Sequence, residues 1–471
     1  MHQALLIDEV FQSVLEYCAD WEQADYRRAL CRLARTCRAW KDPSTERLWS
    51  RLDSHKPLLD LYNDTESAKV VDYYAARVQH FRLTTCLVEP EITTVVLPQL
   101  RSASIAGAGC IVPLNFLASP TLRELRVDFG DFMGTNIAHS RSSSIAVALV
   151  QFTPHLESLR IRGYMGSALR NILPSLTSLR SLVLYAGRSP SATTLASLTM
   201  LPYLQSLTIH APHIEAGEFA AALAPAASFA GLRRLRIRGK RALVCAILSI
   251  IPRGTLRSLH LDDEEYEQEV ATWLPMFDLL ASKTADTLQE LTIDQFKERN
   301  DVFFLALPPS RLGLEALQPL SGLRALRVLT LGLSFTPDLT DRDIDEMATW
   351  WPHLERLDFG TTTDQVNAFD APKTTFAALQ SFAARCPRLH ALVFPLDTSA
   401  FDTPNSAPAE TSVRQTTLRT LIVSPPPSDV GVAAFVRALL TMFPGLVEIE
   451  FTSGDKSLQV DLTKDLAALD G

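Results

Sequence analysis

One short pattern recurs along most of the chain and limits what it can fold into. It consists of a leucine, two residues, an aliphatic residue, one residue and a second aliphatic residue. Twelve clear copies begin between residues 121 and 445, two weaker copies precede them at Val78 and Leu100, and successive copies stand 22 to 38 residues apart. Repetition at such a period indicates a solenoid, in which each repeat covers its apolar edge with the next repeat.

Each copy of this pattern predicts a short strand. Its last two aliphatic residues alternate with polar ones, as in residues 235–238, which is the period of a strand with one buried face. Between the copies lie apolar stretches with a 3.6-residue period, such as residues 242–252, 376–387 and 431–444, and these predict helices. A strand and a helix in every repeat predict an α/β solenoid with parallel strands on its concave face and helices on its convex face.

The pattern resembles the leucine-rich repeat, and the resemblance extends over residues 76–471. The ninth position of that repeat, usually Asn or Cys, is occupied here by other residues, so the resemblance implies about 14 irregular repeats. The leucines of the pattern are predicted to be core residues, and burying one contributes roughly 1.5 to 3 kcal/mol. The clear copies are TLRELRV at 121, HLESLRI at 155, SLRSLVL at 178, YLQSLTI at 203, GLRRLRI at 231, TLRSLHL at 255, TLQELTI at 287, ALRVLTL at 325, HLERLDF at 353, RLHALVF at 388, TLRTLIV at 417 and GLVEIEF at 445.

Residues 1–56 lack the repeat and predict a small helical module, followed by a linker helix at residues 57–75. Apolar residues at helical spacing predict a first helix from Leu6 to Cys18 and a second from Leu30 to Trp40. Asp42 and Pro43 predict the start of a third helix. A module of this size can bury only a modest core, so we expect it to leave apolar surface for the first strand of the array or for a partner protein.

The helical module is similar to the F-box, which docks on the Skp-family adaptor of cullin ubiquitin ligases. The similarity lies in the order of LLIDEVFQSVLEYC, LARTCRAW and ERLWSRL, and the whole chain resembles fungal F-box proteins with leucine-rich repeats. The resemblance implies a non-catalytic substrate receptor of an SCF-type ubiquitin ligase, while other subunits transfer ubiquitin. Leu33, Cys37 and Leu52 also fit internal packing. The residues predicted to bind the adaptor are Leu6, Val10, Phe11, Val14, Cys37, Trp40, Leu48 and Trp49.

The strand alternation also identifies side chains on the exposed inner face of the repeats. Three arginines, Arg234, Arg236 and Arg238, fall on one strand at intervals of about 7 Å, an arrangement suited to carboxylate or phosphate oxygens. A solvated face without a ligand is the alternative. Later copies contribute the acidic residues Asp262, Glu290, Asp294, Asp358, Glu448 and Glu450. The residues predicted to bind an acidic or phosphorylated target protein are Arg126, Arg160, Arg162, His210, Arg234, Arg236, Arg238 and His260.

Residues 397–415 interrupt the array with Pro, Ser, Thr and Ala. This composition predicts a flexible insertion between two repeats.

The overall composition excludes several classes of function. Charged residues make up 21% of the chain and the formal net charge is −8, which does not favour binding to nucleic acid or to a membrane surface. The start lacks a basic region, the longest apolar run is too short to span a bilayer, and the seven cysteines never form a C-x-x-C pair. We therefore expect a cytoplasmic or nuclear protein without disulfides, metal or cofactor.

No motif of a known enzyme class occurs in the sequence. Nucleotide-binding loops, an H-E-x-x-H pair and a G-x-S-x-G elbow are all missing. The acidic run of residues 262–265 lacks the spacing of a metal site. The alternative to a ubiquitin-ligase receptor is a leucine-rich-repeat interaction scaffold or inhibitor, in which the helical module acts only as a terminal cap.

Overall fold

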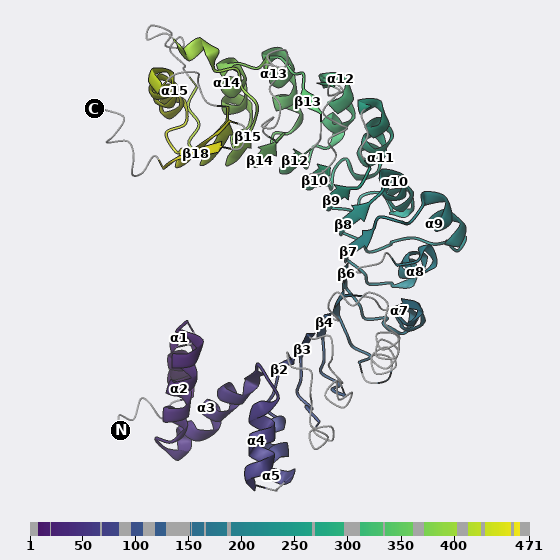
Figure 1. The fold of residues 1–471 in the computed structure, drawn as a ribbon, viewed down its shortest axis with the longest axis vertical. Coiled ribbons are helices and arrows are strands. Elements are labelled where there is room, and N and C mark those ends of the chain that lie inside the picture. The colour runs from purple at the N-terminus through teal and green to yellow at the C-terminus, as the bar shows by residue number, and fades with distance from the viewer. Residues whose placement is uncertain are drawn as a thin grey trace. The chain divides into compact units, whose positions relative to one another are not determined.

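The chain divides into two compact units, residues 1–204 and residues 205–471. Each unit contains its own run of parallel strands with accompanying helices (Figure 1). The computed structural model describes residues 8–18, 20–65, 68–83, 96–106, 118–128, 151, 153–163, 166–185, 190–265, 269–295, 311–332, 335–360, 372–402, 413–424, 429–453 and 456–461.

The first unit begins with helices and continues into a sheet whose strands follow the order β1-β2-β3-β4-β5-β6. Neighbouring strands in this run are parallel. Its helices are α1 (Asp8–Cys18), α2 (Gln23–Ala34), α3 (Arg38–Ser50), α4 (Lys56–Thr65), α5 (Ala68–Ala75), α7 (Gly166–Ile172) and α8 (Ala192–Ser197). Its strands are β1 (Arg51–Leu52), β2 (His80–Leu83), β3 (Ser102–Ala106), β4 (Glu124–Asp128), β5 (Ser158–Arg162) and β6 (Ser181–Tyr185).

The second unit has the strand order β7-β8-β9-β10-β12-β14-β15-β16-β17-β18, while β11 and β13 form a separate pair. Only β18 runs antiparallel to its neighbour among the pairings described for this unit. Its helices are α9 (Ala216–Ala222), α10 (Arg241–Ile250), α11 (Leu274–Thr284), α12 (Leu314–Leu317), α13 (Asp341–Trp350), α14 (Phe376–Arg385) and α15 (Asp429–Met442). Its strands are β7 (Ser206–Ala211), β8 (Arg234–Gly239), β9 (Ser258–Asp263), β10 (Glu290–Gln295), β11 (Arg311–Leu312), β12 (Val328–Gly332), β13 (Thr336–Pro337), β14 (Arg356–Asp358), β15 (Ala391–Val393), β16 (Thr420–Val423), β17 (Glu448–Ser453) and β18 (Lys456–Asp461).

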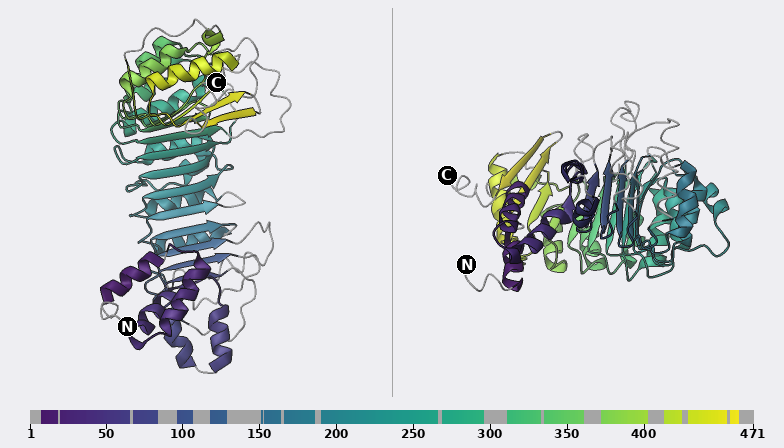
Figure 2. Two further views of the ribbon diagram at one scale, coloured as in Figure 1. Left: turned by 90° about the vertical axis from the view of Figure 1, so that its left-hand side faces the viewer. Right: turned by 90° about the horizontal axis from the view of Figure 1, so that it is seen from below.

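The predicted α/β leucine-rich-repeat solenoid is confirmed as the fold class. All fourteen copies of the pattern coincide with strands, from β2 at Val78 to β17 at Gly445. In the second unit, strands line the inner side of the curve and helices α9 to α14 lie outside it (Figure 1), and Figure 2 shows the strands stacked side by side. The three helices predicted at residues 242–252, 376–387 and 431–444 correspond to α10, α14 and α15.

The parallel pairing keeps equivalent leucines opposite one another. Leu235 of β8 stands opposite Leu259 of β9, which stands opposite Leu291 of β10, and all three are buried. The burial pattern of β8 alternates between exposed and buried positions, as the sequence predicts. Because side chains alternate along a strand, this register sends one set of residues to the core and the other to the exposed face.

A repeated backbone hydrogen bond fixes the start of the strands. The residue after the first leucine of a repeat donates its backbone N–H to the carbonyl of the same position in the preceding repeat. In the second unit this bond runs from Arg257 to Arg233, from Gln289 to Arg257 and from Arg327 to Gln289, each at 2.8 Å. Backbone groups at this position are therefore satisfied by the stacking itself, whatever side chain stands there.

One glycine is required by this close stacking. A Cβ atom on Gly445 would lie 2.1 Å from the backbone oxygen of Thr416, a distance that no side chain tolerates. Gly445 therefore allows the entry to β17 to approach the preceding repeat.

The helical module differs from the sequence prediction in where its third helix begins. We expected the start at Asp42, but α3 begins at Arg38, with Cys37 as its N-cap and Pro43 inside the helix. Trp40 therefore lies in α3, where its ring stacks on Phe11. The Asp-Pro pair is typical of a helix start, but here the helix begins one turn earlier. This additional turn contains Trp40, which packs on Phe11. Asp42 instead accepts a hydrogen bond from the Tyr73 hydroxyl.

The boundaries predicted for the domains, residues 1–56, 57–75 and 76–471, remain predictions. In place of one linker helix, residues 57–75 contain α5 and most of α4. Of the predicted insertion at 397–415, residues 403–412 lie outside the described residues. Its two ends pack against the repeats: Phe401 is buried, and the Gln415 side chain donates to the carbonyl of Cys386.

A buried ion pair connects β9 to the start of α10. The Arg241 guanidinium contacts the carboxylate of Asp263 at 3.2 Å and lies 4.0 Å from the centre of the Trp273 ring. Both charged side chains are almost fully enclosed. Burial raises the pKa of Asp263 to about 6, against the opposing effect of the Arg241 charge. Protonation of Asp263 therefore stabilises the folded chain fully below about pH 4, and this contribution is lost as the pH rises through about 6.

Truncation of a repeat leucine tests the stacked core. Leu235→Ala is expected to lower the free energy of unfolding by about 2 to 5 kcal/mol, because it opens a cavity between adjacent repeats. The measurement is denaturant unfolding followed by circular dichroism. The exposed Val447, truncated to alanine, serves as the control and should change stability by less than about 0.5 kcal/mol.

Removal of Arg241 should lower the free energy of unfolding by an amount that depends on pH. Arg241→Met leaves Asp263 buried without its partner, which typically costs about 3 to 5 kcal/mol where the carboxyl is ionised. The cost should shrink at about pH 5, where Asp263 carries a proton, and be largest at about pH 7.5. Thermal unfolding at both pH values measures it, with the exposed Arg233→Met as control. An equal cost at both pH values would contradict the assignment.

Candidate functional site

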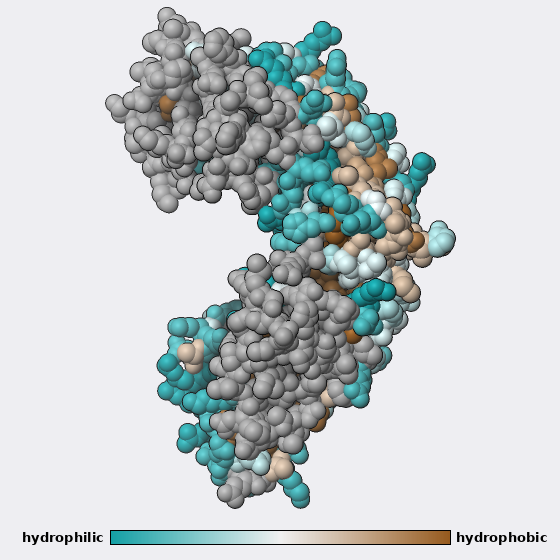
Figure 3. Space-filling model, turned by 45° about the vertical axis from the view of Figure 1, so that its right-hand side comes forward, coloured by the Kyte–Doolittle hydropathy of each residue, from teal (hydrophilic) through white to brown (hydrophobic). Residues whose placement is uncertain are grey.

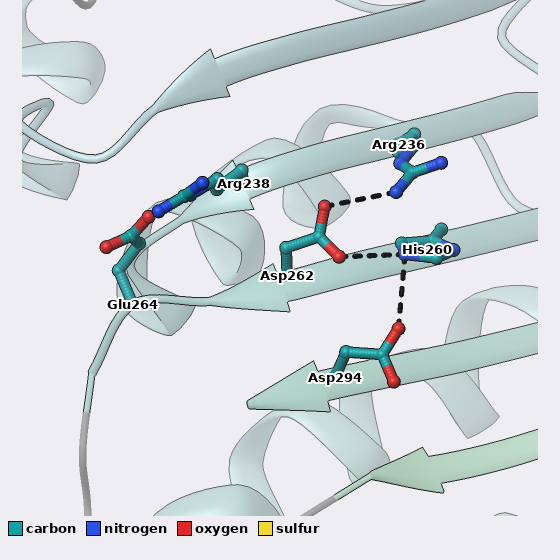
Figure 4. Close-up of polar contacts among 6 residues, drawn as sticks. All are labelled: Arg236, Arg238, His260, Asp262, Glu264 and Asp294. Atoms are coloured by element: carbon teal, nitrogen blue, oxygen red, sulfur yellow. Dashed lines mark hydrogen bonds and ion pairs between the residues drawn. The ribbon is translucent and has the colours of Figure 1, made fainter. Parts of the chain in front are cut away.

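The exposed face of β8, β9 and β10 carries a cluster of charged side chains. The register places Arg236 opposite His260, Arg238 opposite Asp262, and Asp262 opposite Asp294. Neighbouring strands lie about 4.8 Å apart, so these side chains are in contact range. We call the set the polar cluster; its members are Arg236, Arg238, His260, Asp262, Glu264 and Asp294 (Figure 4).

Ion pairs join the members of the polar cluster across the strands. The Nη2 atom of Arg236 lies 3.4 Å from Oδ2 of Asp262, while Nε2 of His260 lies 2.8 Å from Oδ1 of the same carboxylate. The same His260 nitrogen lies 3.4 Å from Oδ2 of Asp294. Arg238 pairs with Glu264. Basic and acidic side chains therefore lie in contact with one another on this part of the face.

These contacts shift the ionisation of several groups. Burial would raise the pKa of Asp262, but the hydrogen bond and charge of His260 and the charge of Arg236 together lower it. Burial raises the pKa of Asp294, and the carboxylates of Asp262 and Asp358 raise it further. The pKa of His210 is lowered by burial and by the positive charge of Arg238.

The row of three arginines predicted on β8 is present, but two of its members are engaged within the chain. Arg236 and Arg238 are paired with Asp262 and Glu264, whereas Arg234 lies opposite Ser206 and Ser258 and is exposed. Acidic residues of β9 lie directly beside these arginines, so basic and acidic side chains are not separated on this part of the face. Binding of a target by this row remains a prediction.

The predicted basic residues of the first unit also lie on the exposed face of their strands. Arg126 stands opposite Arg160, and Arg162 stands opposite Asp128, with 3.8 Å between guanidinium and carboxylate. The Arg160 guanidinium lies 5.3 Å from the centre of the Tyr185 ring. The two adjacent arginines make this part of the face more basic than the polar cluster.

The later acidic positions are distributed over four strands of the second unit. Asp358 is paired with Arg356 of its own strand at 2.9 Å, while Glu290 is exposed on β10. Glu448 stands opposite Thr420 and Glu450 opposite Ile422.

The helical module has a small core of its own. Phe11, Leu15 and Leu30 are buried together, and Tyr26, Leu33, Trp40 and Leu48 pack against them. The Trp40 and Phe11 rings are stacked, with centroids 5.0 Å apart. Phe11 is only 3% exposed, so this predicted adaptor contact belongs to the core. Leu52 is buried and Leu33 is partly buried, in agreement with internal packing for both residues.

A second apolar surface on α1 faces solvent. Val10, Val14 and Tyr17 are 37%, 38% and 75% exposed, and Trp21 just beyond the helix is 47% exposed. The spacing of Val10, Val14 and Tyr17 places them along one side of α1, about a quarter turn from the side that buries Phe11 and Leu15, and Trp21 follows shortly after the helix ends. We call these four residues the α1 stripe. The sequence prediction named Val10 and Val14 but missed Tyr17 and Trp21, although their spacing in the sequence could have indicated them.

The other predicted adaptor residues lie around α3. Trp49 packs on Tyr74 with ring centroids 4.5 Å apart. Leu48, Trp49, Leu52 and Pro57 form the apolar side of a pocket of about 400 Å³. Arg27, Arg28, Cys31 and Arg32 of α2 complete its lining. Cys37 is half-buried, and Leu6 lies outside the described residues.

The stripe stands out among the apolar side chains on the surface. Of the nine large hydrophobic residues exposed among those described, four form the α1 stripe within twelve residues of sequence. In the second unit, hydrophobic residues on the side that faces forward in Figure 3 are interspersed with hydrophilic ones. Among the helices that the structure describes, none combines the length and the apolar character needed to cross a bilayer.

Comparison with known proteins does not assign this chain to a family. No protein-family model matches the sequence, and no curated protein matches it. The crystal structure of the Rad7 and Elc1 complex in yeast has a chain 15% identical to this one, with a TM-score of 0.39, over 84% of this chain and 93% of that chain. A leucine-rich-repeat protein of Leptospira interrogans is 11% identical, with a TM-score of 0.36, over 82% of this chain and 98% of that chain. The chain is a leucine-rich-repeat solenoid by its strand topology and its repeated pattern.

Exchange of charges tests the cross-strand pairing. Arg236→Glu and Asp262→Arg should each destabilise the second unit, because each places like charges side by side, and the double exchange should restore part of the loss. The coupling energy expected for a pair as exposed as this one is about 0.2 to 1 kcal/mol. Chemical unfolding of the four proteins measures it. Arg236→Glu combined with a change at the exposed Asp278 of α11 should instead be additive.

Proposed function

We propose that this chain is a non-catalytic protein-interaction subunit of an SCF-type ubiquitin ligase. The helical module docks on a Skp-family adaptor and, through it, on a cullin, while the polar face of the repeats binds a target protein. The protein then acts in the cytoplasm or nucleus by holding its target close to the ubiquitin-transferring subunits, which raises the effective concentration of the target. The F-box resemblance of residues 1–56 and the exposed apolar surface on the same segment support the proposal.

The α1 stripe is the observation that carries the adaptor half of this proposal. Exposed apolar residues scattered singly need no explanation, but aligned ones on a single helix are typical of a protein-binding surface. Tyr and Trp are also the residue types that contribute most to binding energy at interfaces. Since the core of the module is already formed by Phe11, Leu15 and Leu30, the stripe is not needed for internal packing.

The pocket beside Trp49 gives the proposed partner a second feature. Its apolar side, formed by Leu48, Trp49 and Leu52, favours an apolar anchor, and the three arginines on its other side favour a carboxylate. Arg27 and Arg28 already lie near Asp53 and Asp25, so part of this charge is balanced within the chain. An adaptor segment with apolar and acidic side chains fits both surfaces of the module.

The target half of the proposal depends on the exposed face of the strands. Basic pairs such as Arg126 and Arg160 favour an acidic or phosphorylated segment in the first unit. The polar cluster of the second unit offers charges of both signs. A face with this mixture discriminates between targets by charge complementarity more than by total buried area.

The alternative is a scaffold or inhibitor without a link to ubiquitin. One contact favours it: Arg51 and Leu52 of β1 pair with His80 and Phe81 of β2, so the end of α3 leads directly into the sheet. The helical module therefore caps the first strand, as a terminal repeat requires. The helical module can cap the first strand and also bind an adaptor. A measurement of adaptor binding therefore distinguishes the ubiquitin-ligase subunit from the scaffold or inhibitor.

Two substitutions on the α1 stripe test the adaptor half. The double change Val10→Asp and Val14→Asp should weaken binding to a purified Skp-family adaptor by at least about tenfold, since it places charges in an apolar interface. Isothermal titration calorimetry with the full chain measures the affinity. Substitution is preferable to deleting residues 1–55, because the deletion would also remove β1 and expose the edge of β2.

The matched control is Val96→Asp, at a valine of the first unit that is 44% exposed and lies outside the helical module. It should leave adaptor affinity unchanged. If the wild-type chain does not bind the adaptor, or if the double variant binds as well as the control, the ubiquitin-ligase assignment is wrong and the scaffold alternative stands.

A further inference from the structure

Three side chains of the polar cluster converge on one point of the exposed face. His260 and Asp262 belong to β9, and Asp294 belongs to β10 (Figure 4). One nitrogen and two carboxylate oxygens lie within 4.8 Å of one another. The three residues come from two repeats, and the parallel register places Asp262 directly opposite Asp294.

The two distances from His260 to the carboxylates are compatible with the ligand set of a small metal ion. Zinc binds imidazole nitrogen and carboxylate oxygen at about 2.0 to 2.2 Å, so two of its ligands lie about 2.9 Å apart at a right angle and about 3.4 Å apart at a tetrahedral angle. The Nε2 atom of His260 lies 2.8 Å from Oδ1 of Asp262 and 3.4 Å from Oδ2 of Asp294. Small rotations of the two carboxylates would bring all three atoms around one ion.

The electrostatic environment also favours a cation. Two half-buried carboxylates, those of Asp262 and Asp294, stand side by side on neighbouring strands. A divalent ion between them would remove their mutual repulsion. As a metal ligand, the Nε2 atom of His260 would carry no proton.

The surrounding residues hold the two carboxylates in place. Arg236 contacts Oδ2 of Asp262 at 3.4 Å, which leaves Oδ1 directed at His260, and such outer contacts are typical of metal ligands. On the other side, the neighbouring strand β12 carries Gly332 opposite Asp294. A Cβ atom at position 332 would lie 2.8 Å from Oδ1 of Asp294. The absence of a side chain at Gly332 therefore provides the space that the Asp294 carboxylate occupies.

We propose that His260, Asp262 and Asp294 form a binding site for a divalent transition-metal ion of the zinc type. A set of one imidazole and two carboxylates suits such an ion, whereas Ca²⁺ and Mg²⁺ prefer ligands that are all oxygen. Three protein ligands leave at least one coordination position open towards the exposed face, where water or a side chain of another protein can complete the shell. The site does not depend on the proposed ubiquitin-ligase function, and its test does not involve an adaptor.

The rival occupant is a lysine or arginine side chain of a target protein. The polar cluster already contains the Arg236 guanidinium beside Asp262, which reduces the negative charge left for a second one. An imidazole nitrogen is also a better ligand for a metal ion than a partner for a guanidinium. These two observations favour the metal ion.

The test is isothermal titration of the full chain with Zn²⁺, and with Co²⁺ as a probe whose visible absorption reports the ligands. Wild-type protein should bind one ion in the second unit, and His260→Gln or Asp294→Asn should each weaken binding by more than about tenfold. His390→Gln, at an exposed histidine outside the polar cluster, should bind as the wild type does. Ca²⁺ should not compete. Circular dichroism verifies that each variant is folded.

Gly332→Ala provides a variant that keeps every ligand and every charge. Its methyl group should displace the Asp294 carboxylate and weaken Zn²⁺ binding by about tenfold or more, an effect that negative charge alone would not produce. The proposal is overturned if the wild type does not bind Zn²⁺, or if His260→Gln, Asp294→Asn and Gly332→Ala all bind it with unchanged affinity.

Discussion

The stacking of identical backbone positions is the constraint on which the rest of the structure depends. Each repeat donates the N–H group that follows its first leucine to the same position of the repeat before it, as between Arg257 and Arg233. This bond and the pairing of Leu235, Leu259 and Leu291 fix the register of neighbouring strands without any offset. Because the bond uses only backbone atoms, the fold tolerates different side chains at the position that follows the first leucine.

The same register determines the chemistry of the exposed face. Residues at one position of successive repeats become neighbours at the spacing of adjacent strands. A charged side chain of one repeat therefore interacts with the side chain at the same position of the next repeat. Arg238 and Asp262 are opposite in this sense, and Asp262 and Asp294 are opposite as well. The first pair combines unlike charges and the second combines like charges. His260 lies between the two carboxylates and contacts both, which explains how such a pair is tolerated.

The sequence predicted the fold far better than it predicted the site. The pattern of leucines identified fourteen of the eighteen strands that the structure describes, because the burial of every second residue produces a regular alternation in the sequence. It also identified the exposed side chains of each strand. Their neighbours follow only when equivalent positions of successive repeats are compared. Asp262 and Asp294 each stand directly after a copy of the pattern, so such a comparison could have paired them, whereas a search for metal ligands within the run 262–265 could not.

The helical module shows the same limit at a smaller scale. Its apolar residues were found, but Phe11 was assigned to a partner although its ring stacks on Trp40, while Tyr17 and Trp21 were not considered. When a helix has two apolar sides about a quarter turn apart, its sequence does not show which hydrophobic residues belong to the buried side and which to the exposed side. Only the packing of α2 and α3 against one side shows which residues remain for another protein.

The two candidate surfaces differ in the interaction that each can offer. The α1 stripe is apolar, so binding there depends on the burial of Val10, Val14 and the two aromatic residues, and salt has little influence on it. The exposed face of the repeats carries ion pairs such as Arg236 with Asp262, and contacts made there weaken as salt screens the charges.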